Sequence, residues 1–133
     1  MNILKIEGIG PTYAEKLKAV GVATTERLLK VGADKKGRQG LAEKSGITET
    51  LILEWVNLAD LIRIKGVGEE YSDLLEEAGV DTVKELRNRR PDNLHKALLE
   101  VNEAKNLVRR PPSMSEVESW VAQAKELPPV VTY

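Results

Sequence analysis

The sequence contains no cysteine, no phenylalanine and a single histidine, His95. The absence of cysteine excludes disulfides, thiol nucleophiles, iron–sulfur clusters and every zinc site that uses cysteine. One histidine does not make a histidine-based metal centre or a complete catalytic triad. Aromatic residues amount to only 4%, so few rings remain to stack on exposed bases, which disfavours a single-strand binder built on aromatic platforms. We expect a non-enzymatic protein with no cofactor and no metal.

The chain also lacks a charge excess and a long apolar run. Its 20 basic and 21 acidic residues give a net charge of −1, so any contact with a nucleic acid must be local rather than due to the overall field. No apolar run approaches the roughly 20 residues that span a bilayer, and the N-terminus has no apolar signal region. These features predict a cytoplasmic protein without a membrane partner.

An internal repeat organises the 133 residues. Residues 6–28 align with residues 64–86 without a gap, at an offset of 58. Nine of the 23 aligned positions are identical, far above the one or two expected by composition. The identical pairs are Ile6/Ile64, Gly8/Gly66, Gly10/Gly68, Tyr13/Tyr71, Leu17/Leu75, Gly21/Gly79, Val22/Val80, Thr24/Thr82 and Leu28/Leu86.

The ends of the two copies also correspond, because residues 52–61 resemble residues 117–127. The repeat therefore predicts a first module over residues 1–61, a second over residues 62–127, and a tail at 128–133. Helices this short do not bury an apolar face alone, so we expect the two modules to pack as one unit.

The local signals in each copy are helical. The Gly–apolar–Gly segments predict tight turns, and Pro11 suits the first position of the helix that follows. Gly21 and Gly79 are natural stops for those helices. Thr82 with Glu85 predicts a capping box for the next helix of the second copy, and Thr24 or Thr25 is expected to cap its counterpart in the first copy without an acidic partner. No two-residue period lasts long enough for a strand. The predicted class is all-α.

Further helices are expected downstream in both copies. In the first copy we expect a short helix over residues 38–45, broken at Gly40, and a longer one from Thr48 to about Ile62. In the second copy Asp92 is expected to cap a helix that ends near Asn102. The next helix is expected to begin with a capping box formed by Ser113 and Glu116.

Three single residues have simple expected roles. Trp55 and Trp120 occupy matching positions of amphipathic helices, which indicates that they anchor the repeat core rather than stack on bases. His95 lies among leucines on a helix, which favours a packing or surface role over catalysis.

The segments GIGPTYAEKLKAVGVATTERL and GVGEEYSDLLEEAGVDTVKEL resemble the helix-hairpin-helix family. The GV-x-T-x-x-x-L parts are similar to those of recombinase N-terminal domains and of the C-terminal domain in the RNA polymerase α chain. The resemblance covers residues 1–30 and 48–90 well, and the whole chain looks like a small tandem helix-hairpin-helix protein of an uncharacterised family. In that family the hairpin amides commonly hold a DNA backbone phosphate without reading sequence, although several members are protein-interaction modules.

This resemblance implies a phosphate site in the first copy. Small residues around an apolar anchor let backbone amides at the turn and at the next helix N-terminus converge on one anion. The candidate residues are Gly8, Ile9, Gly10, Thr12 and Tyr13, together with Lys16 and Lys18. Two alternatives remain open, since glycines are also needed wherever a turn packs closely and exposed lysines often serve only solvation.

The second copy differs in charge. Residues 69–78 contain five acids and no base, a net charge of −5, whereas residues 11–20 have a net charge of +1. We expect the second hairpin to be structural or to bind a partner through Gly66, Val67, Gly68, Glu69, Glu70, Glu76 and Glu77. The alternative function is thus a protein-interaction adaptor whose acidic helix docks a basic protein. The acids at its start also stabilise a helix through its dipole.

Three basic clusters are further candidates for phosphate contact. In the second copy, the alternative we favour is pairing of the arginines with the acidic helix. The KKGRQG segment is expected to be mobile and solvated. The clusters are Lys35, Lys36 and Arg38; Arg87, Arg89 and Arg90; and Arg109 with Arg110.

Overall fold

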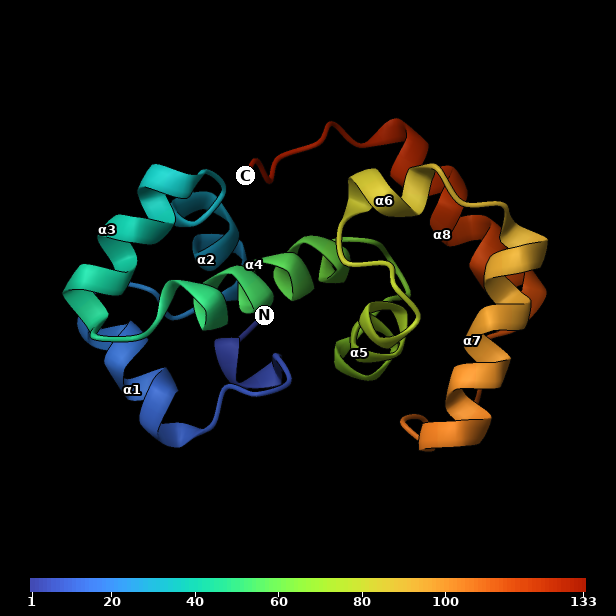
Figure 1. Cartoon of the computed structure of the whole chain (residues 1–133), viewed down its shortest axis with the longest axis horizontal. Helices are drawn as coiled ribbons and strands as arrows, with labels where there is room; N and C mark the ends of the chain where they lie inside the picture. The colour runs from blue at the N-terminus through green and yellow to red at the C-terminus, as the bar shows by residue number, and fades with distance from the viewer. The chain divides into compact units, whose positions relative to one another are not determined.

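A computed structural model describes residues 1–133 as eight α-helices and one 3₁₀ helix (Figure 1). No strand forms, and the one extended pairing is an isolated antiparallel bridge between Asn2 and Thr24. The predicted all-α class is confirmed. The elements are η1 (Ile3–Lys5), α1 (Pro11–Ala19), α2 (Thr25–Val31), α3 (Lys35–Ser45), α4 (Glu49–Ile62), α5 (Glu69–Glu77), α6 (Val83–Arg87), α7 (Pro91–Lys105) and α8 (Met114–Glu126).

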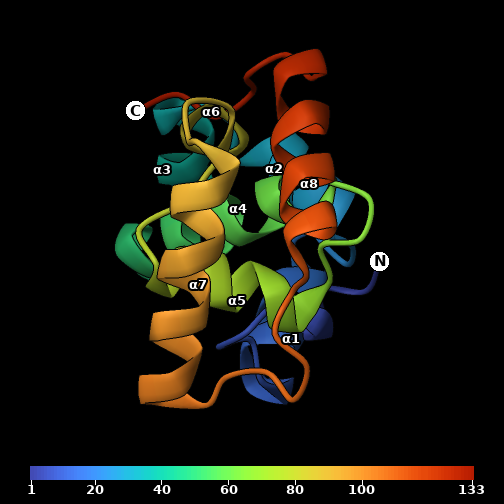
Figure 2. The same cartoon turned by 90° about the vertical axis from the view of Figure 1, so that its right-hand side faces the viewer.

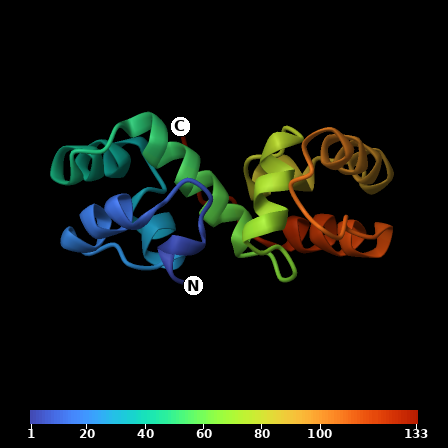
Figure 3. The ribbon, with the colours of Figure 1, turned by 90° about the horizontal axis from the view of Figure 1, so that it is seen from below.

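The chain divides into two compact units. Unit 1 comprises Met1–Asp60 together with Val130–Tyr133, and unit 2 comprises Leu61–Pro129. Unit 1 therefore contains η1, α1, α2, α3 and most of α4, and its chain continues from η1 through the first glycine turn (residues 8–10) into α1 (Figure 3). Unit 2 contains the second glycine turn (residues 66–68) and α5 to α8. Figure 2 shows α7 and α8 side by side and running in opposite directions.

The helix stops and starts are the same in both units. Gly21 and Gly79 follow α1 and α5 with φ of 87° and 92°, in the left-handed region that glycine enters without steric cost. Thr24 and Thr82 then cap α2 and α6 by accepting the amides of Arg27 and Glu85. The predicted stops and threonine caps are confirmed. The predicted capping box is only half formed, because the Glu85 carboxylate pairs with Arg89 instead of the Thr82 amide.

A tryptophan anchors the core of each unit, as the repeat predicts. Trp55 on α4 is 1% exposed, and its ring centroid lies 5.1 Å from that of Tyr13. Trp120 on α8 is 2% exposed and lies 5.2 Å from Tyr71 in the same way. In each pair the two rings are tilted against each other, an arrangement that adds to the apolar burial.

The first glycine of each turn is required by this packing. Gly8 and Gly66 have φ of 94° and 91°. A Cβ at Gly8 would lie 3.2 Å from Nε1 of Trp55, and one at Gly66 would lie 3.1 Å from Nε1 of Trp120. The backbone angle and the close approach of the indole both explain why glycine stands at these two positions.

Four sequence expectations about helices are corrected. α3 begins at Lys35 rather than at Arg38, because the Asp34 side chain accepts the amide of Gly37 and caps the helix, and α3 continues through Gly40 without a break. The KKGRQG segment is thus helical rather than mobile. α7 begins at Pro91 with Arg90, not Asp92, at its N-cap.

The end of the chain packs against unit 1 instead of forming a separate tail. The Thr132 amide donates to the carbonyl of Ala33 over 2.8 Å, and the Thr132 carbonyl accepts from Nη2 of Arg38 over 2.7 Å. Val131 is only 7% exposed, and the Tyr133 hydroxyl lies 3.2 Å from Oδ1 of Asn57. These contacts place residues 130–133 in unit 1.

Candidate functional site

The first glycine turn presents free amides at the start of α1. Ile9 is 4% exposed, and its amide donates to the Ile6 carbonyl over 3.1 Å, so this candidate residue anchors the turn and its amide is not available to an anion. Gly10 is the N-cap of α1, and no side chain caps the helix there. Since Pro11 has no N–H, the amides of Gly10, Thr12 and Tyr13 remain without a protein acceptor.

The second glycine turn has the same backbone. The Val67 amide donates to the Ile64 carbonyl over 3.1 Å, and Val67 is 3% exposed. Gly68 is the N-cap of α5, again without a side-chain cap. Glu69 and Glu70 occupy the first turn of α5 and are exposed.

The lack of a capping side chain distinguishes α1 and α5 from most helices of the chain. α2, α3, α6 and α8 each begin after a residue whose oxygen accepts a first-turn amide, and these caps are Thr24, Asp34, Thr82 and Ser113. At α8 the predicted capping box with Glu116 is confirmed. α7 also begins without a side-chain cap, after Arg90, but there the Asp92 side chain accepts the amide of Asn93. At the two glycine turns no side-chain oxygen accepts a first-turn amide, so these amides stay open to an external anion.

Polar side chains of α1 lie beside the open amides in unit 1. Nζ of Lys16 lies 5.9 Å from the centroid of the Tyr13 ring, within the range of a cation–π contact. Thr12 is exposed, and the hydroxyl of Tyr13 makes no hydrogen bond within the protein. Lys18 is exposed in the last turn of α1. The structure thus groups Gly10, Thr12, Tyr13 and Lys16, with Lys18 further along the helix.

In unit 2 the protein itself covers the corresponding tyrosine. The Tyr71 hydroxyl donates to the Arg110 carbonyl over 2.8 Å, and the Arg110 guanidinium carbon lies 6.0 Å from the ring centroid. Burial raises the pKa of Tyr71 above its usual value. Arg110 belongs to the loop of residues 106–113 between α7 and α8. The corresponding connection in unit 1, between α3 and α4, is shorter and consists of residues 46–48.

Arg110 is held in place by an ion pair with α8. Its Nη1 and Nη2 donate to the two carboxylate oxygens of Glu116 over 2.9 and 3.0 Å. The Arg110 hydrogen bonds, followed by the Ser113 amide, lower the pKa of Glu116 to about 2. The sequence offered Arg110 as a candidate for phosphate contact, and its distance from Tyr71 along the chain gave no sign of this covering role.

Two other candidate arginines of unit 2, Arg89 and Arg90, also have intramolecular partners, but not on the acidic helix as expected. Arg89 pairs with Glu85, and Arg90 pairs with Asp92. On α5 the partner of Glu77 is Lys105, and Glu76 is half-buried. The acidic helix is therefore partly engaged within unit 2.

His95 lies on α7, where its Nε2 is 3.0 Å from the carbonyl oxygen of Pro112. This contact joins α7 to the same loop that carries Arg110.

None of the eight helices combines the length and apolar character needed to cross a bilayer.

Comparison with known proteins identifies the family. Residues 7–127 match the family described as Domain of unknown function (DUF4332), and the chain belongs to this family. No solved structure matches the chain.

Proposed function

We propose that this member of the DUF4332 family is a tandem helix-hairpin-helix protein, without enzymatic activity, that binds the backbone of duplex DNA through the first glycine turn. The observation that carries the proposal is the uncapped start of α1, where the amides of Gly10, Thr12 and Tyr13 have no protein acceptor. Neighbouring hydroxyl groups and a lysine add hydrogen-bond donors and a positive charge beside these amides.

The chemistry of such a site is electrostatic. The N-terminus of a helix attracts an anion through its free amides and its dipole. The Thr12 and Tyr13 hydroxyls add donors, and Lys16 adds a positive charge beside the Tyr13 ring. None of these groups reads a base edge, so binding should be independent of sequence and should weaken as salt increases.

The same backbone in unit 2 is a poor phosphate site. Glu69 and Glu70 place two carboxylates in the first turn of α5, where they repel a phosphate. The hydroxyl of Tyr71 is already bonded to Arg110. We therefore assign DNA contact to unit 1.

A second candidate function uses the acidic helix. Glu69 and Glu70 are exposed on α5, and these side chains are suited to a basic protein partner. In this adaptor function the first glycine turn would be a structural turn only.

The test is a salt titration of the full chain with a fluorescently labelled DNA duplex, followed by anisotropy. A plot of the logarithm of the association constant against the logarithm of the salt concentration should fall with a slope of about −0.9 for each phosphate contacted. Gly10→Glu should weaken binding at least tenfold, because it brings a carboxylate to the open amides. Gly68→Glu is the matched control and should change binding less than twofold.

The two glycine variants are comparable because neither should disturb the fold. A Cβ at Gly10 or at Gly68 meets no atom within 4 Å, and both residues have negative φ, −87° and −100°. Lys16→Glu with Lys18→Glu should also weaken binding and make the slope shallower by about 0.9 for each phosphate that is no longer bound. No binding at low salt, or equal losses from Gly10→Glu and Gly68→Glu, would contradict the proposal. If a basic protein binds the native chain but not the double variant Glu69→Lys with Glu70→Lys, that result would then support the adaptor function.

A further inference from the structure

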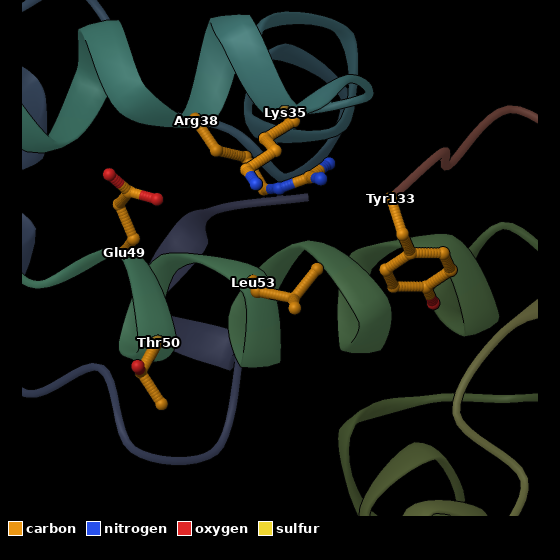
Figure 4. Close-up of a pocket in the computed structure, with 6 residues that line it drawn as sticks. All are labelled: Lys35, Arg38, Glu49, Thr50, Leu53 and Tyr133. Carbon is orange, nitrogen blue, oxygen red and sulfur yellow. The ribbon is translucent and has the colours of Figure 1, made fainter.

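A cleft of about 280 Å³ lies within unit 1, away from the first glycine turn in sequence (Figure 4). Its walls come from three segments: α3, the first two turns of α4, and the end of the chain. The lining residues are Lys35, Arg38, Glu49, Thr50, Leu53 and Tyr133. The volume is slightly below the 300–1,000 Å³ of pockets for drug-sized ligands, so an occupant must be small.

Arg38 places a buried cation on this cleft. It is 4% exposed, and its guanidinium donates to three backbone carbonyls, those of Gly32, Ala33 and Thr132. No carboxylate pairs with it. Since a guanidinium has five N–H groups and three hydrogen bonds are made, two N–H groups remain without a protein acceptor.

A buried positive charge compensated only by neutral carbonyls favours an added anion. Charge-assisted hydrogen bonds to a carboxylate are stronger than those to a carbonyl, and burial of an ion without a counter-charge is costly. The cleft next to Arg38 is where such a carboxylate would reach it. This position therefore selects for a negatively charged group.

Lys35 supplies a second positive charge at the same wall. It is the first residue of α3, where a cation opposes the helix dipole and destabilises the helix slightly. Its presence there is thus not explained by helix stability, whereas a bound carboxylate would explain it. Both Lys35 and Arg38 enter the cleft from α3 (Figure 4).

The rest of the cleft has a different character. Figure 4 shows the Glu49 carboxylate turned toward α3 from the start of α4. Glu49 forms no ion pair with Lys35 or Arg38, so its charge is available to a cationic group. Leu53 and the ring of Tyr133 provide apolar surface, and the Tyr133 ring centroid lies 5.8 Å from the Arg38 guanidinium carbon.

We infer that this cleft binds a small zwitterion, an α-amino acid with an apolar side chain. Its carboxylate pairs with Arg38 and Lys35, its ammonium group lies toward Glu49, and its side chain packs on Leu53 and Tyr133. A phosphate dianion fits less well, because Glu49 repels the extra charge. This binding is independent of the DNA contact proposed for the first glycine turn.

The test uses three probes that share the isobutyl group of leucine, and isothermal titration calorimetry on the full chain. The probes are leucine, 4-methylpentanoate, which lacks the ammonium group, and 3-methylbutylamine, which lacks the carboxylate. Leucine should bind at least tenfold more tightly than either analogue. Lys35→Gln should weaken leucine binding at least fivefold, and Lys36→Gln, on the neighbouring exposed residue outside the cleft, should leave it unchanged.

Glu49→Gln separates the two ends of the ligand. It should weaken leucine binding at least fivefold and leave or improve the affinity for 4-methylpentanoate, while Glu54→Gln on the same helix should change neither. Arg38 is not the test residue, because its loss would remove three hydrogen bonds that hold unit 1 together. Equal binding of leucine and 4-methylpentanoate, no binding of any probe, or equal effects of Glu49→Gln and Glu54→Gln would overturn the inference.

Discussion

The two glycine turns have the same backbone in different surroundings. Gly8 and Gly66 have nearly the same φ, 94° against 91°, and each faces the indole of a tryptophan. Around this shared frame, unit 1 leaves the Tyr13 hydroxyl without a protein partner, whereas unit 2 bonds Tyr71 to Arg110. The comparison teaches that the turn is first a packing element, and that its availability to a ligand is decided by the side chains beside it.

The shared frame should respond equally to loss of its anchor. Trp55→Ala and Trp120→Ala should each lower the free energy of unfolding by about 3–5 kcal/mol, the range for removal of a large buried aromatic side chain. Urea denaturation followed by circular dichroism measures the loss. A loss below about 1 kcal/mol in one variant would show that the two units do not share the same anchor.

These variants also test the expectation that the modules pack as one unit. Each leaves a single tryptophan, so fluorescence reports one unit while circular dichroism reports all helices. Coincident transitions are expected for one cooperative unit. Separate midpoints for the two probes would contradict that expectation.

The first glycine of each turn should be the next most sensitive position. Gly8→Ala and Gly66→Ala force an alanine into positive φ and against the indole, at a cost of about 1–3 kcal/mol each. Gly10→Ala and Gly68→Ala, which have space and negative φ, should change stability by less than about 0.5 kcal/mol. Thermal denaturation of the four variants checks this, and equal effects at all four positions would refute it.

The tyrosine hydroxyls should separate the two turns. Tyr71→Phe removes the bond to the Arg110 carbonyl and should cost about 1 kcal/mol of stability. Tyr13→Phe removes no bond within the protein, so its stability should be unchanged while DNA affinity falls. Chemical denaturation and anisotropy on the same samples measure both effects. A stability loss in Tyr13→Phe equal to that in Tyr71→Phe would contradict the difference between the turns.

The smallest expected effect is an acid dependence of stability. The pKa of Glu116 is about 2 in the folded protein because of Arg110 and the Ser113 amide, against an ordinary value of 4.5. A lowered folded pKa stabilises the protein above about pH 4.5, and this contribution is lost as the pH falls from about 4.5 toward 2. Glu116→Gln should flatten that part of the stability–pH curve.

Unit 1 provides a matched control for the acid dependence. Glu26 also has its pKa lowered to about 2, chiefly by a hydrogen bond from the N-terminal ammonium group, but its side chain is 70% exposed against 30% for Glu116. Solvent screens the more exposed pair, so Glu26→Gln should flatten the curve less than Glu116→Gln. Urea midpoints measured from about pH 2 to about pH 6 decide this, and the reverse order would refute it.

Local chemistry explains which predictions were correct. The Thr24 and Thr82 caps, the stops at Gly21 and Gly79, and the anchoring by tryptophan depend on residues within a turn or on helical spacing, and such signals are readable along the chain. The Ser113 capping box is of the same kind. The candidate phosphate residues were likewise found from a local pattern, the Gly–apolar–Gly turn before a helix. That pattern did not reveal that the Ile9 amide already donates to the Ile6 carbonyl.

The repeat, the helical class and the glycine turns could be read from the order of residues, because periodicity, capping oxygens and positive-φ glycines act over a few residues. Which surfaces are open depends on how the helices pack. Arg38, expected to be solvated, is buried because its guanidinium reaches the Thr132 carbonyl, 94 residues away. Arg110 covers Tyr71 from 39 residues away. Neither interaction has a local signature, since a side chain finds a distant carbonyl only after the intervening helices have packed.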